Sequence, residues 1–277
     1  MKLGCMLYSL GRSIANEAIT VPEALAHIKK SGGEGVDMME STCANYTASE
    51  LKTMATDAGL AISSHIGGRS FTQADSETRS EDLDAIKKLI DDSVEMGTDI
   101  LLVTTGGCAE GQDKADGRRN VASALAEVLP YAKQAGVTLT IEDFGSPVAP
   151  YQTGAEVMDT CELAGPDLMV TYDSGNMVMG DEDPVDFLKL VAARTVHAHA
   201  KDWALVSEDD ARLRSRAGKT YVGTVCGEGV LDYPAVIAEL KQMKYQGYVS
   251  FEYEGLNDPV ENLYQGMAYL GELIAGA

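Results

Sequence analysis

Residues 137–174 read VTLTIEDFGSPVAPYQTGAEVMDTCELAGPDLMVTYDS, and this stretch decides the fold. Its two ends, 137–144 and 168–174, are short runs with many β-branched and apolar residues, which is typical of strands. Between them, 153–164 has the length of a helix, and Gly165 follows it where a left-handed residue commonly ends a helix. The stretch therefore predicts a strand, a helix and a second strand, the repeating unit of parallel sheets.

The same alternation continues in both directions along the chain. The other strand candidates are 3–9, 35–40, 60–66, 99–105, 195–201 and 247–254. The other helix candidates are 22–31, 47–58, 80–96, 117–135, 184–193, 233–244 and 259–274. Eight such units without a linker predict an α/β protein, a single (β/α)₈ TIM barrel over residues 1–277. The runner-up, an open doubly wound sheet, lacks support because no Gly-x-Gly-x-x-Gly follows the first strand.

The composition limits the partners of this chain. It has 22 Lys and Arg against 43 Asp and Glu, a formal net charge of −21, and such a surface repels nucleic-acid phosphates and anionic membranes. No stretch approaches the ~20 apolar residues of a membrane span. The five cysteines form no Cys-x-x-Cys pair, which favours reduced thiols. We therefore expect a cytoplasmic protein that binds a small molecule, with no nucleic acid or membrane partner, and homo-oligomer formation stays open.

Polar and apolar residues alternate in the fifth to eighth strand candidates. Helices cover the outside of a barrel, so the apolar set should face outwards and the polar set inwards. The polar sets end in ionisable residues at the carboxyl end of each strand, where barrel active sites lie. These sets contain Thr138, Thr140 and Glu142; Thr171 and Asp173; Thr195, His197, His199 and Lys201; and Ser250, Glu252 and Glu254.

Glu142, Asp173, His199 and Glu252 form the predicted metal site at the ends of strands five to eight. Three carboxylates gathered in one buried place repel one another and lose hydration, and a divalent cation removes both costs. Any one of the four residues could instead take part in an ordinary hydrogen bond at the barrel mouth. Oxygen-rich ligation with one nitrogen suits Mn²⁺ first, with Mg²⁺, Co²⁺ or Zn²⁺ as alternatives. We expect one such ion per chain.

The segments IEDFG, YDSGNM, VHAHAKDW and GYVSFEYEG carry these four residues and resemble the xylose-isomerase-like TIM barrel superfamily of sugar isomerases and epimerases. The ending GTVCGEGVLDYPAVIAELKQMKYQGYVSFEYE resembles that family especially closely. The resemblance implies one divalent ion on Glu142, Asp173, His199 and Glu252. It also implies that Glu142 and Glu252 are the catalytic residues, serving as opposed bases on either side of the substrate as in the ketose 3-epimerase branch.

The sequence departs from several branches of this family. Asn176 stands where many relatives place a His three residues after the metal Asp, and Phe144 stands where some place a His two residues after the first metal Glu. Both changes leave the substrate open. The related abasic-site endonucleases need three zinc ions and many more histidines than the four in this chain, so we do not expect that activity.

Other residues are candidates for contact with the substrate. His65 ends the third strand and is expected to point into the mouth, with a structural hydrogen bond as the alternative. Lys201 could polarise a carbonyl, or pair with Glu254 or Asp202. Asn176 and Trp203 are further candidates; the Trp203 ring could stack on a sugar or pack under the following loop.

Two more residues have alternative interpretations. Arg214 belongs to a basic cluster in the loop 204–229, a loop position where many barrels bind phosphate. Its alternative is pairing with Glu208, Asp209 or Asp210. His197 lies two residues deeper in its strand than His199, and we expect a core-facing, hydrogen-bonded residue there rather than a ligand.

These expectations favour a divalent-metal-dependent isomerase or epimerase acting on a keto-sugar or inosose. The metal would act as a Lewis acid while a glutamate removes the proton next to the carbonyl, giving a metal-bound enediolate. The alternative is a dehydratase or lyase on a keto-sugar or 3-keto-glycoside that uses the same centre. A third hypothesis is a non-catalytic sugar-binding barrel subunit, although all four ligand candidates are present. The sequence separates neither these outcomes nor a phosphorylated from an unphosphorylated sugar.

Overall fold

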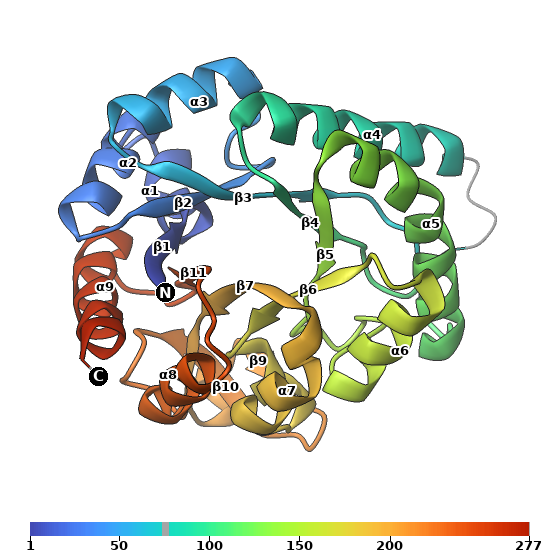
Figure 1. Cartoon of the computed structure of the whole chain (residues 1–277). Coiled ribbons are helices and arrows are strands. Elements are labelled where there is room, and N and C mark those ends of the chain that lie inside the picture. The colour runs from blue at the N-terminus through green and yellow to red at the C-terminus, as the bar shows by residue number, and fades with distance from the viewer. Residues whose placement is uncertain (74–77, 277) are drawn as a thin grey trace.

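The computed structural model describes residues 1–73 and 78–276, which form a closed barrel of eight parallel strands with helices around it (Figure 1). The order around the barrel is β1-β11-β7-β6-β5-β4-β3-β2. The predicted (β/α)₈ TIM barrel is therefore confirmed. The barrel strands are β1 (Lys2–Met6), β2 (Gly35–Met39), β3 (Ala61–Gly68), β4 (Ile100–Thr104), β5 (Thr138–Ile141), β6 (Met169–Asp173), β7 (Thr195–Ala200) and β11 (Tyr248–Phe251).

The helices cover the outside of the barrel, and their main members lie within a few residues of the predicted bounds (Figure 1). They are α2 (Val21–Lys30), α3 (Ala48–Asp57), α4 (Arg79–Met96), α5 (Lys114–Ala135), α6 (Gly154–Ala164), α7 (Pro184–Val191), α8 (Tyr233–Gln242) and α9 (Pro259–Ala275), with the short α1 (Gly11–Ala15) after the 3₁₀ turn η1 (Leu7–Leu10). Other 3₁₀ turns are η2 (Asn176–Gly180), η3 (Ala192–Arg194) and η4 (Glu208–Asp210). No helix in the described part of the chain combines the length and apolar character needed to cross a membrane.

Local sequence explains where several helices begin and end. Thr20, Thr47 and Thr153 each precede a helix and form a capping box with the glutamate three residues later. Gly97 and Gly136 end α4 and α5 in the left-handed conformation. These signals place each helix between two strands with short connections, which fixes where the strand ends meet.

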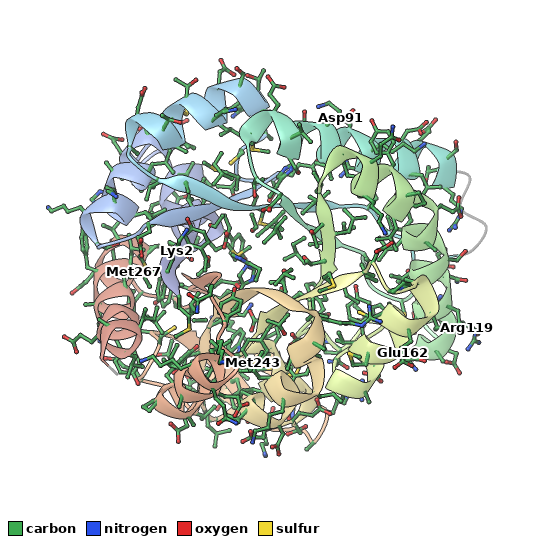
Figure 2. The ribbon with its side chains drawn as sticks, viewed as in Figure 1. Lys2, Asp91, Arg119, Glu162, Met243 and Met267 are labelled. Atoms are coloured by element: carbon green, nitrogen blue, oxygen red, sulfur yellow. The ribbon has the colours of Figure 1, made fainter. Side chains whose placement is uncertain are left out.

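The helices separate apolar from charged side chains. Asp91, Arg119 and Glu162 are exposed on the outer helices, whereas Met267 of α9 is fully buried (Figure 2). The strands supply the other side of this core with residues such as Leu139. The outer layer of the barrel is therefore apolar, as the alternation predicts.

The barrel interior is polar. The hydroxyls of Thr140 and Thr171 lie 2.8 Å apart across β5 and β6, and Ser250 Oγ lies 3.4 Å from His197 Nε2. All four residues are fully buried. The inward polar face predicted for the later strands is therefore present.

The connection between β7 and α8 contains a small sheet where the sequence indicated a loop. Strands β8 (Asp202–Leu205), β9 (Leu213–Arg214) and β10 (Thr220–Thr224) form an antiparallel sheet in the order β8-β10-β9. Long connections commonly have structure of their own when they border a functional site. Gly223 of β10 forms a bridge with Gly255, so this sheet is joined to the chain just after β11.

Gly266 provides a test of the packing that supports β11. An added Cβ at Gly266 in α9 would overlap the ring of Phe251, the last residue of β11. We expect Gly266→Ala to lower the free energy of unfolding by about 1–3 kcal/mol, measured by urea denaturation, because overpacking displaces the ring. Gly271→Ala in the same helix is the control, since the nearest atom to its added Cβ is Leu3 Cδ2 at 3.5 Å. It should be as stable as the wild type or up to about 1 kcal/mol more stable. Equal stability of the two variants would contradict this packing.

Candidate active site

Four ionisable side chains converge at the carboxyl ends of consecutive barrel strands. Asp173 ends β6, His199 lies near the end of β7, and Glu142 and Glu252 directly follow β5 and β11. One ligand atom from each of the four lies within 4.8 Å of every other. His199 Nδ1 is 2.5 Å from Glu142 Oε1 and 3.6 Å from Glu252 Oε2. The structure thus brings together all four residues of the predicted metal site.

The facing atoms of this group make close ionic contacts but form no hydrogen bond of regular geometry among the described residues. They are Glu142 Oε1, Asp173 Oδ2, His199 Nδ1 and Glu252 Oε2, one atom from each residue. Buried polar atoms are costly when unpaired, so native proteins nearly always satisfy them. Three carboxylate oxygens and one imidazole nitrogen form a donor set that suits a divalent cation. The residues present therefore fit a single ion, and the four are a candidate metal site.

Asp37 of β2 lies behind His199 and was missed by the sequence analysis. Its carboxylate accepts a hydrogen bond from Ser63 Oγ at 2.6 Å, contacts His197 Nε2 at 3.1 Å, and lies 3.4 Å from His199 Nε2. Burial would raise the pKa of Asp37, but His197 and His199 lower it well below its ordinary value. A carboxylate behind a ligand histidine fixes the orientation of the ring. Here it directs Nδ1 of His199 towards the three other carboxylates.

The signal for Asp37 was present in the sequence. It is the one charged residue in GVDMM, a strand whose other side chains are apolar. Because a buried carboxylate needs partners, its position pointed to a polar interaction across the barrel. His197 is the main partner, which agrees with its expected role as a deeper, hydrogen-bonded residue.

Lys201 is a buried cation at the edge of the candidate metal site. Its Nζ lies 2.9 Å from Glu252 Oε1, 2.9 Å from Glu254 Oε1 and 3.5 Å from Asp173 Oδ2. Burial would lower the pKa of Lys201, but these carboxylates raise it well above its ordinary value. Burial raises the pKa of both Asp173 and Glu252, and Lys201 offsets this only in part. The pairing with Glu254 is the alternative that the sequence offered for Lys201.

His199 is the second basic side chain at the candidate metal site. Burial would lower its pKa, but Glu142 and Asp37 raise it well above the ordinary value. Without an ion, a proton on His199 is therefore favoured between the two carboxylates. A metal ion held by Nδ1 would take the place of that proton, because a ligand histidine is neutral.

A cavity of about 300 Å³ opens above these residues. Glu142 and Glu252 line it, whereas Asp173 and His199 are fully buried and are not among its lining residues. The other lining residues are Lys201, Asn176, Trp203, Glu254, Tyr8, Met6, Met39, Ile66, Leu102, Thr104, Phe144, Gly145, Ser146 and Leu213. A ligand in this cavity would meet the two glutamates directly.

Besides Lys201, two predicted substrate contacts line this cavity. Asn176 lines it and donates a hydrogen bond from Nδ2 to the Asp143 carbonyl at 2.8 Å. Trp203 also lines it, and its buried Nε1 has no partner among the described residues. Both side chains stay candidates for substrate contact.

The predicted orientation of His65 is wrong. Its Nδ1 lies 2.9 Å from Ser93 Oγ of α4, so the ring faces the helices, and the next residue, Ile66, lines the cavity instead. The physical reason is a register shift between β2 and β3, where Val36 pairs with Ile62 but Asp37 pairs with Ser64. An extra residue in a strand exchanges the faces of the residues that follow. The alternative of a structural hydrogen bond is what the structure shows.

Arg214 is also placed away from the cavity. It is exposed on β9, forms an ion pair with Glu208, and is not among the lining residues. A surface pair of this kind contributes little to stability. The alternative interpretation, an exposed loop residue paired with a neighbouring acid, therefore fits the structure.

Comparisons with known proteins agree with this architecture. An inosose dehydratase of Geobacillus kaustophilus is 31% identical over 109 residues, which cover 37% of this chain and 35% of that protein. The chain thus spans about a third of the length of this curated relative. An L-ribulose 3-epimerase structure has a TM-score of 0.80 at 17% identity and covers 99% of this chain and 94% of its own. The IOLI protein with a bound zinc atom has a TM-score of 0.79 at 14% identity, covering 99% and 98%.

The family itself follows from a match over most of the sequence. The model of the xylose isomerase-like TIM barrel family matches residues 25–273. This range contains the four residues of the candidate metal site and seven of the eight barrel strands. The chain belongs to the xylose isomerase-like TIM barrel family.

Proposed function

We propose that this protein is a divalent-metal-dependent enzyme that removes a proton from the carbon next to the carbonyl of a keto-sugar or inosose and acts as an isomerase or epimerase. The observation that carries the proposal is the convergence of four ligand atoms within 4.8 Å of one another, two of them on glutamates that line the cavity. The cavity of about 300 Å³ is at the lower end of small-molecule sites, about 300–1,000 Å³, and suits a single sugar ring.

Glu142, Asp173, His199 and Glu252 would hold the ion. When bound, a divalent ion supplies Lewis acidity towards the carbonyl oxygen of the substrate. Mn²⁺ is the ion we expect, because the donor set is rich in oxygen. The IOLI protein, which shares this fold, binds a zinc atom, and this supports a bound metal without fixing its identity here.

Glu142 and Glu252 are the proposed bases. Both reach the cavity, from strand ends on either side of β6 and β7, and each has a second carboxylate oxygen that could accept a proton. Glu142 is the more exposed, with 14% of its side chain accessible against 5% for Glu252. Lys201 donates a hydrogen bond to Glu252 Oε1, which holds that carboxylate in place. We therefore assign the first proton removal to Glu142.

The sugar is proposed to be unphosphorylated. Lys201 is the cation among the lining residues of the cavity, and Glu252 and Glu254 already neutralise it at 2.9 Å each. The net charge of −21 would also repel a phosphorylated substrate. Trp203 and the apolar residues of the wall offer a surface for the ring, and Asn176 offers a polar contact.

A dehydratase is the second candidate. It begins with the same proton removal and continues with loss of a hydroxyl from the next carbon as water. The inosose dehydratase relative favours it, and so do Asn176 and Phe144, which differ from the histidines of the ketose 3-epimerase branch. The two reactions differ in how the substrate lies in the cavity, so one experiment on the product can separate them.

Metal content tests the single site. We expect one tightly bound divalent ion per chain after Mn²⁺ loading, measured by inductively coupled plasma mass spectrometry. Because the ion binds the folded state, free metal at 100 times its dissociation constant should add about 2.7 kcal/mol to the unfolding free energy, and a chelator should lower Tm. A stoichiometry near zero or near three contradicts the proposed site.

The two buried histidines give a matched pair of variants. His199→Ala should lower metal affinity by at least about 10–100-fold, because it removes Nδ1 from the centre. His197→Ala should keep the metal but lower the unfolding free energy by about 1–3 kcal/mol, since Asp37 loses its hydrogen-bond partner. Calorimetric metal titration and urea denaturation measure the two effects. The reverse pattern would show that the assignment of the ligand histidine is wrong.

Isotope exchange tests the chemistry. Keto-sugars and inososes incubated with the Mn²⁺-loaded protein in D₂O should acquire deuterium at the carbon next to the carbonyl, detected by NMR. Glu142→Gln should slow this exchange by about 10²–10⁴-fold, as expected for loss of a general base. Exchange with retention of all hydroxyls indicates an isomerase or epimerase, and exchange with loss of water indicates the dehydratase. Turnover without deuterium in the product would rule out the glutamate bases.

A further inference from the structure

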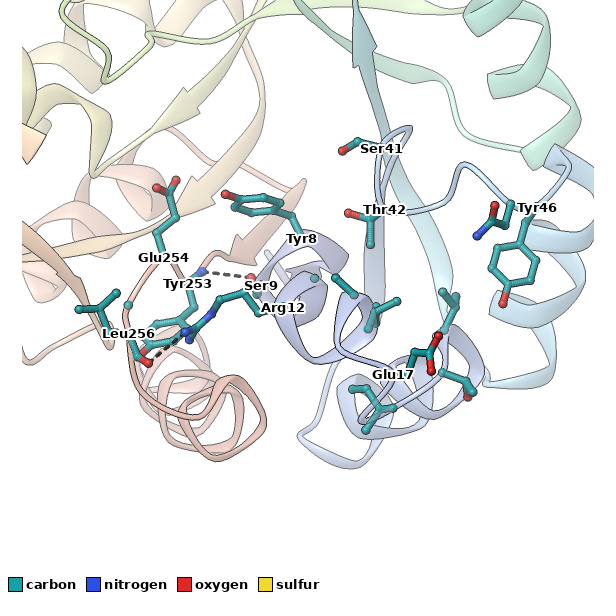
Figure 3. A pocket seen from close by; sticks show the side chains of 18 residues that line it. Tyr8, Ser9, Arg12, Glu17, Ser41, Thr42, Tyr46, Tyr253, Glu254 and Leu256 are labelled. Carbon is teal, nitrogen blue, oxygen red and sulfur yellow. Dashed lines mark hydrogen bonds between the residues drawn. The ribbon is translucent and has the colours of Figure 1, made fainter. Parts of the chain in front are cut away.

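A second, larger hollow adjoins the active-site cavity. This groove has a volume of about 880 Å³ and lies between η1 and α1, the segment after β2, and the residues that follow β11 (Figure 3). Tyr8 and Glu254 line both the groove and the cavity. In Figure 3 the hydroxyl of Tyr8 points towards the side of Glu254. The two hollows are therefore neighbours that share these two side chains, and Lys201 Nζ holds Glu254 Oε1 at 2.9 Å.

Gly11 keeps the groove open beside Tyr8. Its backbone is right-handed helical, with φ −56° and ψ −36°, so its conformation does not require glycine. Close packing does not require it either, because an added Cβ would meet only Thr42 Oγ1 and Tyr8 Cδ2, both at 3.9 Å. A longer side chain at this position would extend between Tyr8 and Thr42. Glycine at this position therefore leaves the space between Tyr8 and Thr42 open.

The groove wall suits a neutral, hydroxylated ring. Ser41 and Thr42 supply hydroxyl groups, and Figure 3 shows the rings of Tyr8 and Tyr46 on either side of them; Asn45 adds an amide to the lining. Aromatic faces with nearby hydrogen-bonding groups hold a ring through its apolar body and its polar edge.

The charges of the groove disfavour an anionic group. Arg12 is the cation among the lining residues, and its two terminal nitrogens donate to the carbonyls of Leu256, at 3.0 Å, and Asn257. The other charged lining residues, Glu17 and Glu254, are acidic. A phosphate or carboxylate in the groove would meet more negative than free positive charge.

We propose that the substrate of this protein has two rings joined by a glycosidic oxygen, with the reacting sugar in the cavity and a neutral second ring in the groove. The linkage would pass between Tyr8 and Glu254, the two side chains that both hollows share. This inference rests on the proposed function, because it takes the cavity over Glu142 and Glu252 as the place of the reacting sugar. It narrows the substrate class from a free keto-sugar or inosose to a glycoside.

Binding of sugars that carry no keto group tests the groove independently of the proposed reaction. The ligands are methyl β-glucoside, which has one ring, and cellobiose and phenyl β-glucoside, which have two, each titrated by calorimetry into the Mn²⁺-loaded full-length protein. At least one two-ring ligand should bind 10-fold or more tightly than methyl β-glucoside. A gain with cellobiose identifies a sugar as the second ring, and a gain with phenyl β-glucoside identifies an aryl group; either supports the proposal.

Gly11→Leu tests whether the gain comes from the groove. The backbone at this position is helical, so the variant should fold with an unchanged circular dichroism spectrum and Tm while losing the two-ring gain. Ser49→Leu is the control, because Ser49 is exposed on α3 and does not line the groove, and it should keep the gain. Absence of the gain in the wild type, or its persistence in folded Gly11→Leu, would overturn the proposal.

The deuterium-exchange experiment distinguishes failure of the proposed function from failure of the proposed glycoside site. Deuterium exchange on free keto-sugars without any two-ring gain would leave the proposed function standing and remove the groove from substrate binding. A two-ring gain that Gly11→Leu abolishes, without exchange on any keto-sugar or 3-keto-glycoside, would support the groove as a glycoside site and remove the proposed chemistry.

Discussion

Repulsion between buried carboxylates is the constraint on which the rest of this site depends. The parallel barrel brings the ends of β5, β6, β7 and β11 together, and three of these ends carry an acidic residue within 4.8 Å of the others. Lys201 and His199 compensate part of that charge, yet burial still raises the pKa of Asp173 and Glu252. Such a cluster destabilises the fold unless a cation joins it, and unsatisfied atoms on all four side chains face the place where one would bind.

A polar layer deeper in the barrel holds this centre in position. Asp37 contacts both histidines of β7, and Ser63 donates to its other oxygen, so the orientation of His199 depends on a strand on the far side of the barrel order. The residues are fully buried, and their rotamers are fixed by packing on rigid strands. Removing one partner would leave an unpaired buried charge, which costs far more than the hydrogen bond itself contributes. The layer therefore couples the stability of the barrel to the geometry of the candidate metal site.

Much of this was predictable because barrels turn sequence alternation directly into geometry. The apolar outward face at Leu139 and the polar inward face at Thr140 required only the period of a strand, and convergence of the strand ends required only the closed topology. His65 was misplaced because one extra residue in β3 exchanged the two faces, and no local signal in the run of small residues revealed it. Asp37 was missed because its main partner, His197, lies 160 residues away, a separation that alternation within one strand does not report. The β8-β10-β9 sheet was also missed, because it depends on strand pairing within a long connection.

The ionisable groups of the site and the lining of the groove come from different sets of strands. The late strands supply the ionisable groups, which are suited to one elementary step, removal of a proton next to a carbonyl. The early strands β1 and β2 lead into segments that line the groove, whose side chains are mostly neutral, with Arg12 paired to backbone carbonyls and Glu17 an exposed acid. Proton removal is common to isomerases, epimerases and dehydratases, and the later steps of each reaction depend on which face and which carbon lie near each glutamate. A second ring bound in the groove would fix that orientation at a distance from the reacting atoms, as remote binding energy does in other enzymes. The groove would then determine the outcome of the proposed reaction, although its residues take no part in the proton transfer.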